Sequence, residues 1–422
     1  MGATTIERDA DDTAPQRGAT SPREHLDVLV VGAGLSGIDA AHHLRTSCPW
    51  ATFAMFEGRD RIGGTWDLFR YPGIRSDSDM FTFSYPWKPW PLDRTIGKGD
   101  EIRRYIEEAA HEDGTYSKIR FRHRVVRAEW SSDDGRWTVT AERLGDDATA
   151  VETFELTAGF VVSCTGYYRY DRGYLPDWDG LDDFEGTLIH PQAWPSGVDL
   201  KGKHVVVVGS GATAVTLVPE LAKVASKVTM LQRSPTYMVS LPTTNAPTKV
   251  LSRVLPRRWR GGALRWQYVA ATLGMFKLSR RAPTVMKRVL RRQVASRLPP
   301  GFDVDRHFTP HYEPWDQRLC VVTDGDLFKA IRNGSVEMVT DHIERFTRTG
   351  LELREGGALD ADVVVAATGL DILIGGGTEL FVDGDKVDPA TRLTYKGTML
   401  EGVPNLALVI GYANARGLSR RT

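Results

Sequence analysis

Two glycine-rich turns constrain the fold of this chain more than any other feature. Each follows a short apolar run, Val28–Val31 or the four valines at 205–208, and each precedes a stretch that reads as a helix. A run that is apolar on both faces is typical of a buried parallel strand. Strand, glycine turn and helix together begin a Rossmann-type nucleotide-binding unit. We therefore expect an α/β fold with two Rossmann-type dinucleotide-binding domains.

The first turn has the spacing G-x-G-x-x-G. Its first glycine permits the tight turn, the second lets a pyrophosphate approach the backbone, and the third lets the helix pack on the strand. The phosphates are expected at the helix N-terminus, where unpaired N–H groups and the helix dipole favour an anion. The next strand ends in a glutamate suited to ribose hydroxyls. The residues assigned here are Gly32, Gly34, Ser36, Gly37 and Glu57. A glycine-rich loop without a ligand is the alternative.

The second turn has the related spacing G-x-G-x-x-A, ending at Ala214. Its following strand lacks the terminal acid and is followed by an arginine and a serine. An acid would repel a 2′-phosphate, whereas an arginine accepts it through paired hydrogen bonds. The first site should therefore hold an adenine dinucleotide without that phosphate, and the second should hold NADP. The residues assigned to the second site are Gly209, Ser210, Gly211, Ala212, Thr213, Arg233 and Ser234.

Two dinucleotide sites in one chain indicate an oxidoreductase in which a nicotinamide reduces a flavin. Two further strand-like stretches, GFVVSCTG ending at Gly166 and ADVVVAATGLD ending at Asp371, end in similar turns. Small residues at strand ends allow the backbone to approach a cofactor closely. Ordinary strand ends remain the alternative there.

A basic segment lies in the second half of the chain. From Leu221 to Phe302 there is no Asp or Glu, against seventeen Lys and Arg. We expect two or three basic amphipathic helices here, which either cap the active site in solvent or contact an anionic membrane surface peripherally. Nucleic acid is not an expected partner, because 54 Lys and Arg balance 54 Asp and Glu over the whole chain.

Several other classes of protein are excluded by the composition. The three cysteines, Cys48, Cys164 and Cys320, are too far apart for a disulfide framework, a redox pair or a zinc site. No apolar run reaches the roughly 18 residues that span a bilayer. Residues 1–25 are polar and acidic, unlike a signal peptide, and are expected to form a disordered tail. A cytoplasmic protein without a metal is the resulting expectation.

Two longer motifs carry a family resemblance. The segment FEGTLIHPQAWP matches F-x-G-x-x-x-H-x-x-x-W-P through Phe184, Gly186, His190, Trp194 and Pro195. The segment GGTWDLFRYPGIRSD at 63–77 matches G-G-x-W-x-x-x-x-Y-P-G-x-x-x-D. With both glycine turns, these motifs resemble those of the Baeyer–Villiger monooxygenases over 27–414. The stretch 307–346 is most similar to a mycobacterial branch of that family.

The resemblance implies a class B flavoprotein that uses FAD, NADPH and O2. Such enzymes insert oxygen next to the carbonyl of a ketone or aldehyde through a C4a-peroxyflavin, and the same peroxide can oxidise the sulfur of sulfides or thioamides. Arg318 matches the active-site arginine, which stays charged and can hold an anionic peroxide, and Asp77 matches its partner. The residues that fall where relatives contact FAD are Gly64, Thr65, Trp66, Asp77, Phe83 and Val125.

Three details refine this expectation. Gln317 stands where the family usually has a lysine for the NADP phosphate, so selectivity for NADPH should rest mainly on Arg233 and Ser234. His190 is expected near the linkers, where it couples domain motion, in preference to an acid–base role. Trp194 with Pro195 favours a Baeyer–Villiger enzyme over a flavin monooxygenase that oxidises nitrogen or sulfur, which remains the alternative. The substrate and the oligomeric state stay open.

The resemblance also implies a domain division. Residues 26–168 and 372–422 are expected to form the FAD domain, and 169–371 the NADP domain with a helical insert at about 243–305. Relatives continue beyond residue 422, and a one-base deletion in a GC-rich family ending would produce the sequence of 416–422. We therefore interpret the C-terminus as a short out-of-frame tail, which leaves a truncated, inactive flavoprotein as a further alternative.

Overall fold

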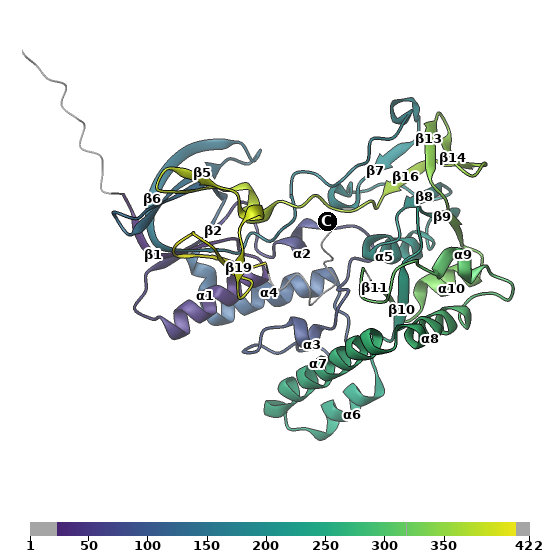
Figure 1. The fold of residues 1–422 in the computed structure, drawn as a ribbon, viewed down its shortest axis with the longest axis horizontal. Helices are drawn as coiled ribbons and strands as arrows, with labels where there is room; N and C mark the ends of the chain where they lie inside the picture. Colours follow the sequence, from purple (N-terminus) through teal and green to yellow (C-terminus); the bar gives the residue numbers. More distant parts are fainter. Residues whose placement is uncertain (1–22, 318, 411–422) are drawn as a thin grey trace, which may run out of the picture.

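The computed structural model describes residues 23–317 and 319–410, which form two lobes, each built around its own β-sheet (Figure 1). The two sheets differ in their strand directions and share the same kind of nucleotide-binding turn. Most of the expected N-terminal tail, Arg318 and the expected out-of-frame C-terminus lie outside the described residues. The expected α/β fold with two Rossmann-type units is confirmed.

The first lobe contains a nine-stranded sheet in which parallel and antiparallel parts meet. Strand β1 lies between β6 and β2 and is parallel to both, whereas β5 is antiparallel to β4 and β6. The main strand order is β18-β17-β4-β5-β6-β1-β2-β3, with β21 paired to β6. The strands are β1 (His25–Val31), β2 (Phe53–Glu57), β3 (Ile119–Phe121), β4 (His123–Ser131), β5 (Arg136–Leu144), β6 (Ala150–Ser163), β17 (Glu379–Val382), β18 (Asp385–Val387) and β21 (Leu406–Leu408).

The helices of the first lobe begin and end at recognisable signals. Helix α1 (Leu35–Ser47) begins directly after the first glycine turn. Helix α4 (Gly99–Asp113) begins at Lys98, whose backbone N–H donates to the Glu101 side chain, and ends at Gly114 in the left-handed conformation. Glycine is favoured there because it has no Cβ to clash. Two short helices, α2 (Thr65–Leu68) and α3 (Met80–Phe83), follow the first dinucleotide unit.

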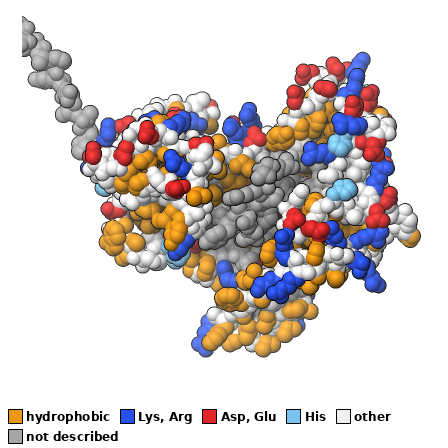
Figure 2. Space-filling view, in the orientation of Figure 1, with side chains coloured by type: hydrophobic (Ala, Val, Ile, Leu, Met, Phe, Trp, Pro, Cys, Tyr) orange, Lys and Arg blue, Asp and Glu red, His pale blue; other side chains and the backbone are white. Residues whose placement is uncertain are grey.

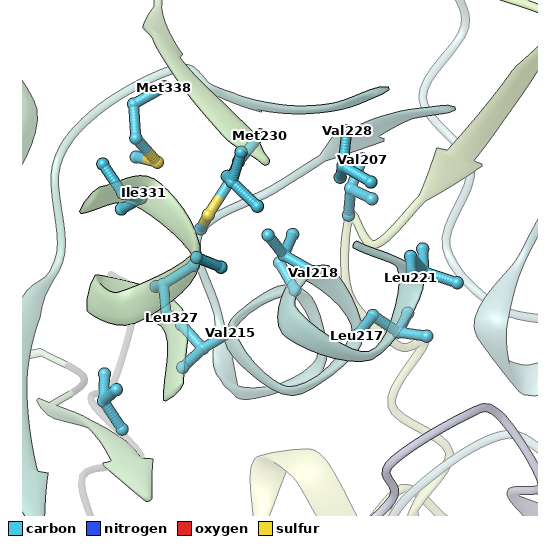
Figure 3. Packing of buried hydrophobic residues seen from close by; sticks show 14 of the residues in the cluster. Val207, Val215, Leu217, Val218, Leu221, Val228, Met230, Leu327, Ile331 and Met338 are labelled. Atoms are coloured by element: carbon cyan, nitrogen blue, oxygen red, sulfur yellow. The ribbon is translucent and has the colours of Figure 1, made fainter. Parts of the chain in front are cut away.

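The second lobe contains a five-stranded parallel sheet in the order β12-β9-β8-β16-β7. Its strands are β7 (Thr187–Ile189), β8 (His204–Val208), β9 (Lys227–Gln232), β12 (Val336–Thr340) and β16 (Val363–Ala366). Helices α5 (Ala212–Leu221), α9 (Val304–Phe308) and α10 (Asp326–Arg332) also belong to this lobe. Figure 3 shows Val215 on α5 and Leu327 on α10 beside Met230 on β9, and all three side chains are fully buried. Burial of such side chains is the main source of stability for this lobe.

Smaller elements complete the two lobes. A two-stranded parallel sheet pairs β10 (Tyr237–Leu241) with β11 (Leu319–Thr323), and a three-stranded antiparallel sheet joins β13 (Ile343–Thr347), β14 (Gly350–Leu353) and β15 (Ala358–Asp360). Strands β19 (Thr394–Tyr395) and β20 (Met399–Leu400) form a separate pair. Short 3-10 turns are η1 (Thr115–Lys118), η2 (Leu181–Asp183), η3 (Pro191–Ala193), η4 (Ile374–Gly377) and η5 (Pro389–Thr391).

Three helices form an insert between β10 and α9: α6 (Ala246–Val254), α7 (Arg257–Arg281) and α8 (Pro283–Ala295). The insert joins the lobes, because Arg265 on α7 donates to the Ser84 carbonyl at 2.6 Å and the Tyr268 hydroxyl lies 2.8 Å from the Thr95 hydroxyl. The expectation of amphipathic helices is wrong for α7, which exposes Trp259 and Trp266 to solvent while it buries Leu264. In the part of the chain that the structure describes, no helix is long and apolar enough to cross a bilayer.

Two linkers connect the lobes and run side by side. Tyr168 in the first linker and Ile372 in the second form an antiparallel bridge. Next to it, the Arg169 N–H donates to the Asp371 carbonyl, and the Leu373 N–H donates to the carbonyl of the first linker, both at 2.9 Å. The chain therefore leaves the first lobe and returns to it at one place.

Candidate functional site

The first glycine turn is tightly packed against the neighbouring strand. Gly32 has a φ of +103°, and a Cβ there would lie 2.6 Å from the Cys164 carbonyl oxygen, just beyond β6. A Cβ on Gly37 would lie 2.0 Å from the Gly32 oxygen. Gly34 is the N-cap of α1 and provides no side chain to cap it. The first N–H groups of a helix have no acceptor within the helix, so the N-terminus of α1, at the carboxyl ends of the parallel strands β1 and β6, can bind an anion. Ser36 lies in the first turn of this helix.

The G-G-x-W segment closes over this turn. A Cβ on Gly64 would lie 3.2 Å from the Gly34 Cα, and Gly64 has a φ of +55°. Thr65 begins α2, and its hydroxyl lies 3.4 Å from the hydroxyl of Tyr170, which comes from the first linker. Two glycines that face each other leave a narrow space lined by backbone, which suits a pyrophosphate or ribityl chain. No sequence motif indicated Tyr170, because only the folded linker brings it beside Thr65.

Glu57 lies at the end of β2, beside the turn, and is buried. Its carboxylate accepts hydrogen bonds from the backbone N–H of Ala33 at 2.8 Å and of Arg59 at 2.9 Å. Burial raises the pKa of Glu57, and the two backbone hydrogen bonds oppose that rise. A carboxylate fixed in this way can accept hydrogen bonds from ribose hydroxyl groups, as the sequence predicted.

An ion pair that the sequence did not reveal supports the G-G-x-W segment. Arg59 donates to the buried Asp67 carboxylate at 2.7 Å and to the Gly64 carbonyl at 3.3 Å. Arg70 also reaches Asp67, at 3.3 Å. Asp67 lies at a variable position of the fingerprint, so no motif indicated its role. The pair ties the end of β2 to the segment that faces the first turn.

The remaining residues expected at the flavin lie in different places. Trp66 and Phe83 are in edge-to-face contact, with ring centroids 5.8 Å apart. Val125 is buried on β4 in a separate apolar cluster, where its carbonyl accepts a hydrogen bond from the Thr378 hydroxyl at 3.2 Å. Asp77 is exposed. Its expected partner Arg318 lies outside the described residues, so that pair stays a prediction.

The second glycine turn repeats the construction of the first. Gly209 has a φ of +140°, and a Cβ there would lie 2.3 Å from the Ala367 carbonyl oxygen, just beyond β16. Gly211 is the N-cap of α5 and again provides no side-chain cap. The Ser210 hydroxyl lies 2.8 Å from that of Thr236, which ties the turn to the segment after β9. Ala212 and Thr213 lie in the first turn of α5, whose N–H groups can bind a second anion.

The residues expected to select NADPH are accessible. Arg233 and Ser234 are exposed directly after β9, and Arg233 forms no ion pair with any residue that the structure describes. The preceding Gln232 is fully buried, and its side chain donates to the Thr340 hydroxyl at 2.8 Å. The backbone that carries Arg233 is therefore fixed while the guanidinium is available to a phosphate. Gln317 is also exposed.

His190 and Gln192 together connect the fingerprint to the two linkers. Its Nδ1 accepts a hydrogen bond from the Gln192 backbone N–H, and its Nε2 lies 3.2 Å from the Gly369 carbonyl oxygen in the second linker. The Gln192 side chain donates to the Arg169 carbonyl in the first linker at 2.9 Å. These contacts require the neutral Nε2–H tautomer. Burial lowers the pKa of His190 and favours the same neutral form. A Cβ on Gly173 would overlap the imidazole ring.

The other residues of this fingerprint anchor it to the second lobe. A Cβ on Gly186 would lie 2.7 Å from the Asp362 carbonyl oxygen, so the segment must approach that backbone closely. Phe184 packs edge-to-face on the buried Phe346, and Trp194 packs against the core of the lobe. Pro195 is exposed after η3. The fingerprint thus fixes His190 with respect to the sheet.

Contacts between the lobes gather around the G-G-x-W fingerprint. Arg75 donates to the Asp326 carboxylate at 2.6 Å across the boundary, and both side chains are largely shielded from solvent. Tyr71 packs against the core of the second lobe, and burial raises the pKa of Tyr71. A cleft of about 690 Å³ lies alongside, lined by Trp66 of the first lobe and Glu220 of the second.

The described residues include no cluster of three or more His, Cys, Asp or Glu side chains suited to a metal ion. All three cysteines are free thiols. Burial raises the pKa of the Cys164 thiol to about 12, so it stays protonated. The side chains around the two turns are instead donors and acceptors suited to phosphate and ribose groups.

Comparison with known proteins agrees with this geometry. The model of the flavin-binding monooxygenase-like family matches residues 95–374, and that of an NAD(P)-binding Rossmann-like domain matches residues 30–90. The FAD-containing monooxygenase EthA of Mycolicibacterium smegmatis is 49% identical over 393 residues, which cover 93% of this chain and 79% of EthA. EthA of Mycobacterium tuberculosis is 48% identical over the same shares. The expected resemblance to a mycobacterial branch is thereby confirmed.

Solved structures agree with the two-lobed architecture. A steroid monooxygenase in its oxidised form, bound to NADP, superposes with a TM-score of 0.72 at 25% identity, covering 91% of this chain and 80% of that one.

Proposed function

The chain belongs to the flavin-binding monooxygenase-like family, and from this membership we propose that it catalyses Baeyer–Villiger oxidation, the insertion of one oxygen atom next to a ketone or aldehyde carbonyl. The coarser assignment is plain: the chain is a flavin monooxygenase, an oxidoreductase that uses FAD and NADPH. The proposal concerns which atom of the substrate receives the oxygen.

The two turns fit the two cofactors. The cradle formed by Gly32, Gly34 and Gly64, with Glu57 beside it, would hold the FAD pyrophosphate and ribose. The N-terminus of α5, with Arg233 after β9, would hold NADPH. When bound and reduced, the flavin supplies the activation of O2. The residues of the chain would hold both cofactors and exclude water around the reacting atoms.

The segment 184–195 is the observation that supports a Baeyer–Villiger reaction. It matches the fingerprint of those enzymes, including Trp194 and Pro195 where flavin monooxygenases acting on nitrogen or sulfur differ. His190 within it contacts the second linker, and Gln192 contacts the first. We infer that His190 couples the position of the NADPH lobe to the flavin and transfers no proton, because both ring nitrogens are engaged by backbone groups.

Asp77 and Arg318 are the proposed catalytic pair. An arginine keeps its charge at every working pH and can hold the negative charge that develops on oxygen during the reaction. Asp77 is exposed and forms no ion pair with another described residue, so its carboxylate is available to orient that arginine. Removal of one such charge commonly lowers the rate about 10²–10³-fold.

Product analysis tests the proposed reaction. The purified protein, NADPH and ¹⁸O2 are incubated in parallel with an aryl ketone and with a thioether of similar size. We expect an ester that contains one ¹⁸O atom, with the sulfoxide as a second product because a soft sulfur also accepts the oxygen. A sulfoxide without any ester would assign the chain to sulfur oxidation, and NADPH oxidation that yields only hydrogen peroxide would contradict both.

Variants locate the catalytic pair. Arg318→Ala and Asp77→Asn should keep the flavin spectrum and its bleaching by NADPH while ester formation falls about 10²–10³-fold. Asp93→Asn is the matched control, since Asp93 is also an exposed aspartate of the first lobe. Ester formation near the normal rate in Arg318→Ala would remove Arg318 from its catalytic role.

The partners of this reaction are small molecules. They are NADPH, O2 and a ketone, aldehyde or sulfur compound. We place the reaction in the cytoplasm, where NADPH is regenerated.

A further inference from the structure

Helix α7 exposes an apolar stripe opposite to the face that it buries. Trp259, Trp266 and Leu273 are 62%, 71% and 52% exposed, and their spacing of seven residues places them on one side of the helix. Leu264 and Ser279, near the opposite side, are buried. A helix that is apolar on two sides needs a second apolar environment in addition to the core that it already contacts.

The neighbouring helices also expose apolar side chains. Val250 and Val254 on α6 are 58% and 74% exposed, and Val285 and Val289 on α8 are 52% and 54% exposed. Figure 2 shows hydrophobic atoms covering the end of the molecule formed by α6 and α7, below the two lobes. Contiguous apolar surface of this kind is uncommon on a monomer and marks a site of interaction.

Helices α6, α7 and α8 contain no acidic residue of their own. Among the residues that the structure describes, acidic side chains of the following segment pair only with Arg280, Lys287 and Arg291, at the end of α7 and on α8. The sequence from Leu221 to Phe302 has no Asp or Glu and seventeen Lys and Arg. Lys249, Arg253 and Arg258 are exposed beside the stripe and form no ion pair among residues 23–317 and 319–410. The guanidinium of Arg258 lies 5.9 Å from the centre of the Trp259 ring, so cation and aromatic group face the same region.

We propose that α6 and α7 bind the surface of an anionic lipid bilayer, with Trp259, Trp266 and Leu273 entering the headgroup region. Tryptophan is favoured at that depth, and basic side chains around an apolar stripe are attracted to anionic headgroups. A second copy of the chain is a poorer occupant, because two such faces would bring unpaired positive charges together. A solvated cap would not need the apolar stripe.

The contact is peripheral and would leave the two lobes outside the bilayer. Each basic side chain near an anionic surface strengthens binding roughly fivefold at low salt, and salt screens this contribution. The insert also contacts the first lobe through Arg265 and Tyr268. A membrane-bound insert would therefore hold the first lobe close to the bilayer, where apolar substrates are concentrated.

Cosedimentation with vesicles tests the proposal on the full 422-residue protein. Vesicles of phosphatidylcholine mixed with phosphatidylglycerol are compared with vesicles of phosphatidylcholine alone, at low and high salt. We expect binding to the mixed vesicles, at least tenfold weaker binding to the neutral ones, and loss of binding at high salt. Tryptophan fluorescence should shift to the blue on binding. Equal binding to both vesicle types, or to neither, overturns the proposal.

Substitutions assign the binding to α7. The double variant Trp259→Glu/Trp266→Glu should lose vesicle binding while its circular dichroism and flavin content stay unchanged, because both side chains are exposed. Trp50→Glu is the matched control, since Trp50 is 75% exposed on the first lobe, and it should bind as the unchanged protein does. Undiminished binding by the double variant overturns the proposal. So does a dimer that forms through this face, detected by sedimentation, in place of vesicle binding.

Discussion

At Gly32 and Gly209 the chain requires glycine for space as well as for conformation. Both residues have a positive φ. A Cβ on Gly32 would overlap the Cys164 carbonyl oxygen, and a Cβ on Gly209 would overlap the Ala367 carbonyl oxygen. The spacing of glycines in the sequence predicted both turns, because that spacing is local. The contacts of Glu57 with Ala33 and Arg59 could not be predicted in the same way, since they depend on how β2 ends beside the turn.

Gly32→Ala should abolish FAD binding. The φ of +103° is strained for alanine, and the new Cβ would lie 2.6 Å from the Cys164 oxygen, so the turn must move away from β6. Flavin content after purification measures the effect. Gly274→Ala on α7 is the control, because no atom lies within 4 Å of its added Cβ, and alanine there should stabilise the helix by about 0.5–1 kcal/mol. A flavin-replete Gly32→Ala protein would contradict this account of the turn.

Arg233→Ala should raise the KM for NADPH far more than that for NADH. A charge-assisted contact with a phosphate contributes about 1.5–3 kcal/mol, which corresponds to roughly ten- to a hundredfold in binding. Steady-state kinetics with both nucleotides measure the difference. Lys227→Ala, at the exposed start of the same strand, is the control for loss of one positive charge. Equal effects of Arg233→Ala on the two nucleotides would place the 2′-phosphate elsewhere.

The linkers are the element on which the proposed coupling depends. His190 bonds to the second linker and Gln192 to the first, while backbone hydrogen bonds join the linkers to each other. Two segments ending at Gly166 and Asp371 were singled out from the sequence because of their small residues. The structure places Cys164 and Ala367 within these segments beside the two glycine turns, and the segments continue into the two linkers. Their pairing across the lobe boundary could not be predicted, since it joins residues about 200 positions apart, and loop closure over such distances leaves no local pattern.

The stability that His190 contributes should decrease at acidic pH. Burial holds its pKa below the ordinary value of 6.5, so the unfolded chain binds the proton more readily than the folded one. This contribution is complete above pH 6.5 and is lost as the pH falls toward the lowered pKa. The difference in Tm between the unchanged protein and His190→Gln should therefore narrow on acidification. His43→Gln is the control, because His43 is exposed and its substitution shows how the loss of one imidazole alone changes the Tm. A difference that widens at acidic pH would contradict the neutral tautomer.

Helix α7 shows where periodicity in a sequence is ambiguous. The basic segment was expected to form amphipathic helices, and buried Met286, Leu290 and Val294 on α8 fit that expectation. On α7 the apolar residues face two sides, because one side contacts the first lobe and the other is exposed. A sequence pattern shows which residues of a helix are apolar. It does not show which of them contact the rest of the protein and which are exposed.

In the whole molecule, the two lobes are held by a few polar contacts in addition to the linkers and the insert. Arg75 and Asp326 form the shielded ion pair among them, with side chains 13% and 27% exposed. The fingerprint that carries Arg75 was recognised from the sequence, whereas its partner on α10 was not. The relative position of the two lobes depends on such long-range contacts. The expected domain boundaries at 168 and 372 remain a proposal.

The Arg75–Asp326 pair should couple the lobes measurably. In a double-mutant cycle with Arg75→Ala and Asp326→Ala, we expect an interaction energy of about 1.5–3 kcal/mol, as for charge-assisted hydrogen bonds shielded from water. Unfolding in urea gives the energies. The pair of Arg143 and Glu152, each 52% exposed, is the control and should give only about 0.2–1 kcal/mol. The same value for both pairs would mean that the lobes separate freely in solution.

The adjacent linkers also determine how this architecture can be recombined. Because Tyr168 and Ile372 form a bridge with each other, the second lobe is an insertion into a single loop of the first. Insertions are tolerated where their two ends lie close together. Exchange at these two junctions would therefore replace the entire nicotinamide-binding lobe as one cassette. The protein encoded by such a gene would accept a different nicotinamide cofactor as its reductant and would keep the same flavin lobe.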